Sequence, residues 1–210
     1  MLTRFYLLLI IFFTAGIFSA QQNEEFKQVK DYFDYQRFML SQQFRNKIMQ
    51  EDNRTEKLMI EKDFDVFMAK LDSVQNTALL GALIKVKNRE DLSWLYAENL
   101  EEMELQIKRK EQITQEAQYP GGFNNLRSQI ADIFYSDSVL PQIPVLTTTV
   151  EFVVEKDGSI GSVKAAGENF TFNRQAEIAM YLLPDRFTPA KINGTPVRYR
   201  FRLPLSMNLQ

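Results

Sequence analysis

Residues 147–165 read TTTVEFVVEKDGSIGSVKA, and this stretch defines the architecture of the carboxy-terminal part of the chain. Apolar Val150, Phe152 and Val154 alternate with polar residues, which is the period-2 pattern of a strand with one buried face. An Asp-Gly pair follows and marks a tight turn, because Gly158 can adopt a positive φ. The pattern predicts two antiparallel strands, Thr147–Glu155 and Ser159–Ala165.

Downstream, the pattern changes to that of a helix and then returns to a strand. Small and apolar residues recur over Asn173–Leu183, and Pro184 ends this second helix of the region. Asn193-Gly194 forms a turn, and beyond it apolar residues alternate with arginines. We therefore expect a third strand over Val197–Leu203, which completes a three-stranded antiparallel sheet.

Upstream, Tyr119-Pro120 and two glycines form an extended entry to the first helix of the region. Apolar residues lie on one helical face over Phe123–Tyr135. Pro141 and Pro144 then enforce an extended connection to the sheet.

Taken in order, the Tyr-Pro entry, the Asp-Gly hairpin, the segment Phe187-Thr188-Pro189-Ala190, the Asn-Gly turn and the Leu203-Pro204 ending resemble the C-terminal domain of TonB. TonB is the periplasmic protein that drives outer-membrane transporters. The resemblance covers roughly residues 118–206 and implies an α+β domain over 118–210. Such a domain performs no catalysis and works by lending a sheet edge to a partner.

In the TonB family, the last strand captures the TonB box, a short N-terminal segment of an outer-membrane receptor, by strand addition. The matching strand here carries three arginines on one face, which either favour an acidic partner segment or solvate the sheet. The Tyr-Pro segment either contacts the receptor or forms a rigid turn. The resemblance thus implies partner-binding roles for Tyr119, Pro120, Val197, Arg198, Tyr199, Arg200, Phe201, Arg202 and Leu203.

The amino terminus, residues 1–20, has the pattern of a secretory signal. Arg4 precedes the apolar run Phe5–Phe13, and small Ala20 precedes a polar segment. The alternative is an uncleaved inner-membrane anchor over residues 5–20, although the run is short for a span. Both alternatives predict a periplasmic location in a Gram-negative bacterium.

The middle of the chain, residues 21–117, is predicted to be helical. It has no proline between Asn23 and Gln118, and apolar residues recur at helical spacing. Polar runs at Glu51–Thr55 and Lys87–Arg89 indicate breaks. We expect three or four helices in a compact bundle, not the Pro-rich extended spacer that is usual in TonB proteins.

The composition excludes several classes of function. The chain has no His and no Cys, so the commonest general base, the thiol nucleophile, disulfides and the usual zinc sites are absent. A net charge of −2 argues against nucleic-acid binding. We expect no enzyme activity, no catalytic residues, no metal site and no cofactor.

Two functions follow from the resemblance. One is a TonB-like protein that binds outer-membrane receptors and supports TonB-dependent transmembrane transport. The other is a secreted adaptor that has a TonB-type domain but transduces no energy. Coupling to an inner-membrane motor complex is in doubt, because residues 5–20 lack the histidine that the family's membrane helix carries. Homo-oligomerisation is left open.

Overall fold

The computed structural model describes residues 17–96, 112–139 and 145–208. Within these residues, four α-helices accompany a three-stranded antiparallel sheet and a two-stranded sheet, so the predicted mixture of helix and antiparallel sheet is confirmed. The predicted signal or anchor lies outside the described residues up to position 16. No described helix combines the length and the apolar character that a membrane crossing requires.

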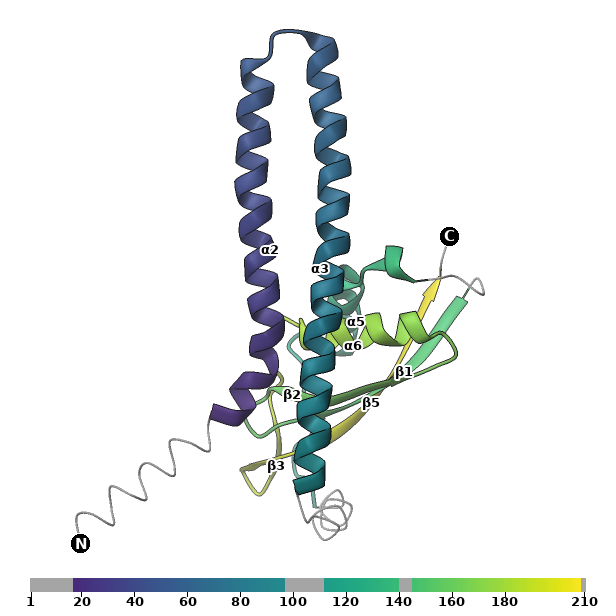
Figure 1. The fold of residues 1–210 in the computed structure, drawn as a ribbon. Helices are drawn as coiled ribbons and strands as arrows, with labels where there is room; N and C mark the ends of the chain where they lie inside the picture. The colour runs from purple at the N-terminus through teal and green to yellow at the C-terminus, as the bar shows by residue number, and fades with distance from the viewer. Residues whose placement is uncertain (1–16, 97–111, 140–144, 209–210) are drawn as a thin grey trace, which may run out of the picture.

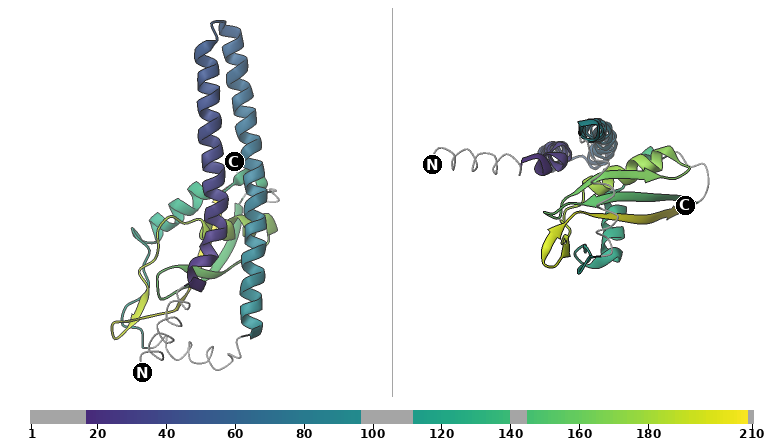
Figure 2. Two further views of the ribbon diagram at one scale, coloured as in Figure 1. Left: turned by 60° about the vertical axis from the view of Figure 1, so that its left-hand side comes forward. Right: turned by 90° about the horizontal axis from the view of Figure 1, so that it is seen from below.

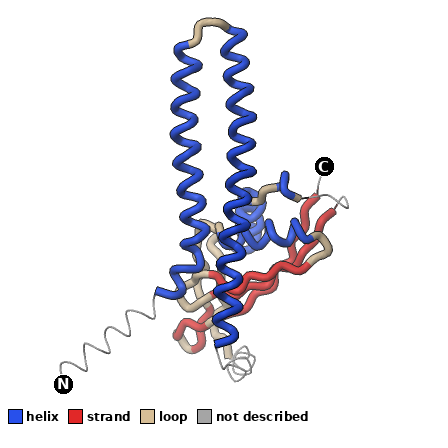
Figure 3. The backbone as a smooth tube through the Cα atoms, in the orientation of Figure 1, coloured by secondary structure: helices blue, strands red, loops and turns tan. Residues whose placement is uncertain are grey.

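Two long helices form an antiparallel hairpin whose upper part projects beyond the rest of the molecule (Figures 1 and 3). They are α2 (Ile17–Gln50) and α3 (Arg54–Tyr96). The break predicted between them is confirmed. There, the Asn53 side chain accepts a hydrogen bond from the Thr55 backbone N–H at 2.9 Å and caps the start of α3.

The second predicted break, at Lys87–Arg89, is wrong, because α3 continues through it to Tyr96. These polar side chains do not mark a helix end, because they make contacts with distant segments. Lys87 binds β2, and Arg89 pairs with Glu25 of α2 at 3.0 Å. The compact bundle is also wrong: residues 17–96 form a single extended hairpin.

The larger sheet has the order β2-β1-β5, with both pairings antiparallel. The first two strands match their predictions within a few residues. The third differs: the predicted Val197–Leu203 strand is interrupted at Arg198, which separates β4 from β5, and β5 extends well beyond Leu203. The strands are β1 (Val145–Val154), β2 (Ile160–Ala166), β3 (Ala190–Ile192), β4 (Thr195–Val197) and β5 (Tyr199–Asn208).

Tight turns connect these strands. Asn193 and Gly194 both have positive φ, 49° and 82°, and join β3 to β4 as a two-residue hairpin. At Gly158, φ is 82°, and a Cβ atom would lie 2.0 Å from the Phe187 carbonyl oxygen. Only glycine therefore fits the turn between β1 and β2.

Helices α5 (Gly122–Ile133) and α6 (Phe170–Tyr181) cover one face of the larger sheet (Figures 1 and 2). Residues of β1 that face them are buried, such as Val150 and Phe152, whereas Thr147 on the opposite face is exposed. A short 3₁₀ helix, η1 (Ser136–Ser138), follows α5.

The hairpin docks on α6 and shares one hydrophobic core with the sheet. Phe26 of α2 is completely buried, and its ring stacks on that of Tyr181 at 4.9 Å between centroids. Leu83 and Val86 of α3 belong to the same core. Helix α6 therefore lies between the sheet and the hairpin, which explains why it is buried on nearly all sides.

Candidate functional site: the two edges of the sheet

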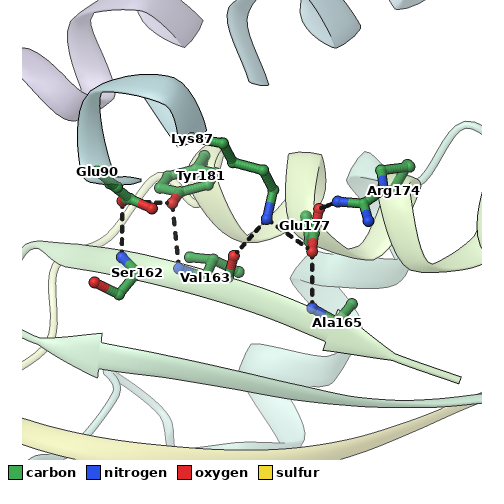
Figure 4. A network of polar contacts seen from close by, with 8 residues as sticks. All are labelled: Lys87, Glu90, Ser162, Val163, Ala165, Arg174, Glu177 and Tyr181. Atoms are coloured by element: carbon green, nitrogen blue, oxygen red, sulfur yellow. Dashed lines mark hydrogen bonds and ion pairs between the residues drawn. The ribbon is translucent and has the colours of Figure 1, made fainter. Parts of the chain in front are cut away.

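The β2 edge of the sheet is covered by side chains of α6 (Figure 4). The backbone N–H of Ala165 points away from β1 and donates to Glu177 Oε1 at 2.8 Å. The N–H of Val163 donates to the Tyr181 hydroxyl oxygen at 3.2 Å. These bonds replace those that a neighbouring strand would make.

Helix α3 covers the same edge from the hairpin. A β-bulge places Ser162 at a φ of 53°, and its N–H donates to Glu90 Oε1 at 2.8 Å. The Lys87 ammonium donates to the Val163 carbonyl oxygen at 3.0 Å. With its backbone groups satisfied by side chains of two helices, β2 has no free edge for strand addition.

A buried charge network holds this cover in place. Glu177 is completely buried and forms ion pairs with Lys87, at 3.0 Å, and with Arg174. Tyr181 donates its hydroxyl proton to Glu90 Oε1 at 2.9 Å. Burial raises the pKa of Tyr181 far above its usual value, so the phenol stays protonated and remains a donor.

Burial also raises the pKa of Glu90 above its ordinary value of 4.5, against the opposing effects of the Ser162 and Tyr181 hydrogen bonds. For a carboxyl group, a raised pKa means that folding favours the protonated form. This contribution to stability is present in full below pH 4.5 and is lost as the pH rises through the raised pKa.

Lowering the pH from 7 to 4.5 is therefore expected to stabilise the wild type relative to the Glu90→Gln variant. The glutamine keeps an acceptor for Ser162 but cannot take up a proton. Urea unfolding of both proteins across this range measures the difference in the free energy of unfolding. All other titrating groups are common to the two proteins, and a difference that stays constant with pH would contradict the prediction.

The opposite edge of the sheet, on β5, is open. Because Ala165 points its N–H away from β1, its neighbour Lys164 bonds to β1, where it lies opposite Glu151. Bonding alternates along a strand, so Val150 and Phe152 of β1 bond to β5. On β5, the residues whose backbone groups point outward are Arg200, Arg202, Pro204 and Ser206.

Pro204 agrees with this assignment. Proline has no N–H and is tolerated in a strand where that group would face outward from an edge. It lies opposite Thr149 without costing the sheet a hydrogen bond. The open edge thus offers N–H donors at Arg200, Arg202 and Ser206, and a carbonyl alone at Pro204. Within the described part of the chain, no strand pairs with this side of β5.

The structure separates the side chains of the predicted site. Tyr199, Phe201 and Leu203 face the helices, and the arginines face solvent. Two of the arginines have partners on β1: Arg198 Nη2 lies 2.8 Å from Glu155 Oε1, and Arg202 Nε lies 3.5 Å from Glu151 Oε1. Among the described residues, Arg200 forms no ion pair. Val197 ends β4, outside β5.

The Tyr-Pro segment lies away from the outer edge of β5. The Tyr119 ring is 5% exposed, contacts Phe187 at 4.8 Å between centroids and donates its hydroxyl to Gln129. Its carbonyl closes the turn that leads into α5 by accepting from the Gly122 N–H at 2.8 Å. The rigid-turn interpretation is therefore favoured for Tyr119, and Pro120 is the exposed member of the pair.

Sequence reasoning missed the residues that cover β2. Lys87 and Glu90 lie in a polar run that resembles a helix break, and Glu177 looks like an ordinary surface charge. One signal was available: Glu177 is flanked by Ala176 and Ile178 in a helix with little polar surface, and a charge in such a place requires partners.

Comparison of the chain with protein-family models, curated proteins and solved structures found no match. Among the described residues, no group of acidic side chains is arranged to hold a metal ion. Function is therefore argued from the geometry of the two sheet edges.

Proposed function

We propose that this protein binds an extended segment of a partner protein by strand addition to β5. The observation that carries the proposal is the contrast between the two edges of one sheet. Side chains of α3 and α6 satisfy the β2 edge, whereas β5 presents outward N–H and carbonyl groups with no strand beside them. Such an edge is a template for pairing with another chain.

We further propose that the partner is an outer-membrane receptor and that the protein supports TonB-dependent transport. The support is the resemblance of residues 118–206 to the TonB C-terminal domain, together with an open edge on the strand that this resemblance selects. The segment to be captured is then a TonB box. An inner-membrane motor complex is a second partner if the amino terminus remains as an anchor.

Replacing Arg202 with proline tests strand addition. The Arg202 N–H points outward, as the position of Pro204 does, so the variant is expected to fold. It loses the donor at the centre of the edge and leaves a carbonyl of the added strand unpaired, which costs about 1–3 kcal/mol, or roughly ten- to a hundredfold in affinity. Isothermal titration of the full-length chain with peptides from the N-termini of TonB-dependent receptors measures the loss.

Arg202→Gln is the matched control, because it removes the charge and keeps the N–H. We expect it to bind within about threefold of the wild type, since exposed charges contribute little. Equal affinities of wild type and Arg202→Pro would overturn strand addition at this edge. A loss of the same size in both variants would assign binding to the guanidinium and not to the backbone.

A second candidate function is a periplasmic adaptor whose hairpin binds another protein. The projecting part of the hairpin exposes large apolar side chains: Tyr35 and Phe38 are each 59% exposed, Met49 is 71% exposed, and Leu58 is 59% exposed. Exposed apolar surface of this kind marks interaction sites. Recovery of a processed, soluble protein would favour the adaptor, and a full-length protein in the inner membrane would favour the transducer.

A further inference from the structure

A hollow of about 120 Å³ lies between α5 and the last residues of β5. Its lining is mainly apolar, with Ile130, Ala131 and Phe134 from α5, Phe172 from α6, and Leu205 and Met207 from β5. For scale, an engineered cavity of about 150 Å³ lined by apolar side chains binds benzene. The hollow is therefore the right size for one aliphatic side chain.

The position of the hollow relates it to the open edge. Helix α5 runs along β5: Phe123 near its start contacts the Phe201 ring at 5.7 Å, and Phe134 lines the hollow together with Met207. In a strand added beside β5, every second side chain would point to the face that carries α5. One of these side chains, level with Leu205, would enter the hollow.

Arg127 gives the hollow a charged margin. It lines the hollow, its side chain is exposed, and it forms no ion pair with any described residue. It lies one helical turn before Ala131, and therefore on the side of the hollow nearer to Phe201. Along an added strand, the next side chain on the same face is two residues away. A carboxylate at that position would lie beside the Arg127 guanidinium.

We infer that the captured segment carries an aliphatic side chain that fills this hollow, and an aspartate or glutamate two residues away, toward the Phe201 end, that pairs with Arg127. The hollow then selects the partner, while the backbone of β5 supplies sequence-independent pairing. This inference rests on the proposed function, because the segment reaches the hollow only as a strand added to β5.

The test selects partners without assuming them. A displayed library of random peptides is selected against the full-length chain, and an enriched peptide is synthesised together with a version whose aliphatic residue is alanine. We expect an aliphatic position with an acidic residue two away, and a loss of about ten- to a hundredfold when the aliphatic side chain is removed.

Two matched variants locate the effect. Ala131→Phe places a ring in the hollow and is expected to weaken the aliphatic peptide about tenfold or more while leaving the alanine peptide unchanged. Ser128→Phe adds the same ring to an exposed position of α5 that does not line the hollow, and is expected to change neither affinity. Urea unfolding confirms that both variants fold. Arg127→Gln is expected to weaken only peptides that carry the acidic residue.

The outcomes separate the two proposals. Binding that Arg202→Pro reduces, with no aliphatic preference and no effect of Ala131→Phe, would overturn the role of the hollow and leave strand addition standing. Binding that Arg202→Pro leaves unchanged would overturn strand addition, and the inference would fall with it. Sensitivity to both variants, confined to the aliphatic peptide, would support both.

Discussion

Replacing Glu177 with alanine is expected to lower the free energy of unfolding by about 3–5 kcal/mol. The carboxylate is completely buried, accepts the Ala165 N–H at 2.8 Å and balances both Lys87 and Arg174. Its removal leaves a buried N–H without an acceptor and two cations without their counter-charge. Urea unfolding of the full-length chain, followed by circular dichroism, measures the loss.

Glu168→Ala provides the control for this prediction. Glu168 is an exposed carboxylate between β2 and α6, and its removal should change stability by no more than about 0.5 kcal/mol. Glu177→Gln should fall between the two, because it keeps an acceptor for Ala165 and loses the charge. If Glu177→Ala costs no more than Glu168→Ala, the network does not hold the β2 edge as described.

Local patterns predicted the strands and helices of the carboxy-terminal part well. The alternation of apolar and polar residues placed β1 and β2, and the Asp-Gly and Asn-Gly turns placed their ends, because both signals depend on a few adjacent residues. The end of the last strand was missed, since a Pro-containing segment argues against a strand unless it lies at an edge. Pro204 lies at such an edge.

Long-range contacts explain the errors in the hairpin. A polar run such as Lys87–Arg89 indicates a helix end only if its side chains face water. Here Lys87 reaches β2, far away along the chain, and Arg89 reaches α2. Neither contact can be deduced from periodicity, so a continuous helix was divided.

The candidate site was predictable only in part. The alternation of arginines with apolar residues on the last strand was visible in the sequence and is confirmed by burial. Which edge of the sheet is open was not visible, because it depends on where the hairpin docks. The pairing of Arg198 with Glu155 depends in turn on the register between β1 and β5. The family resemblance selected this strand, and the geometry supplies an independent reason to select it.

The docking of the hairpin leads to the second large prediction, the replacement of Phe26 with alanine. Phe26 lies early in α2 yet is completely buried against Tyr181, in the core that the hairpin shares with the sheet. We expect a loss of about 3–5 kcal/mol in the free energy of unfolding, from lost burial and the cavity left behind. Urea unfolding measures this loss, and hydrogen exchange is expected to show faster exchange in the first turns of α2.

Phe38→Ala is the matched control for Phe26→Ala, because it removes the same side chain from the same helix at a position that is 59% exposed. We expect it to change stability by no more than about 0.5 kcal/mol. Phe26→Leu should retain most of the stability, since it keeps an apolar side chain in the core, and it remains informative if the alanine variant does not fold. Equal losses for Phe26→Ala and Phe38→Ala would mean that the lower hairpin is not docked on α6. The cover of the β2 edge by Lys87 and Glu90 would then lose its support, because these side chains reach the strand only from a docked α3.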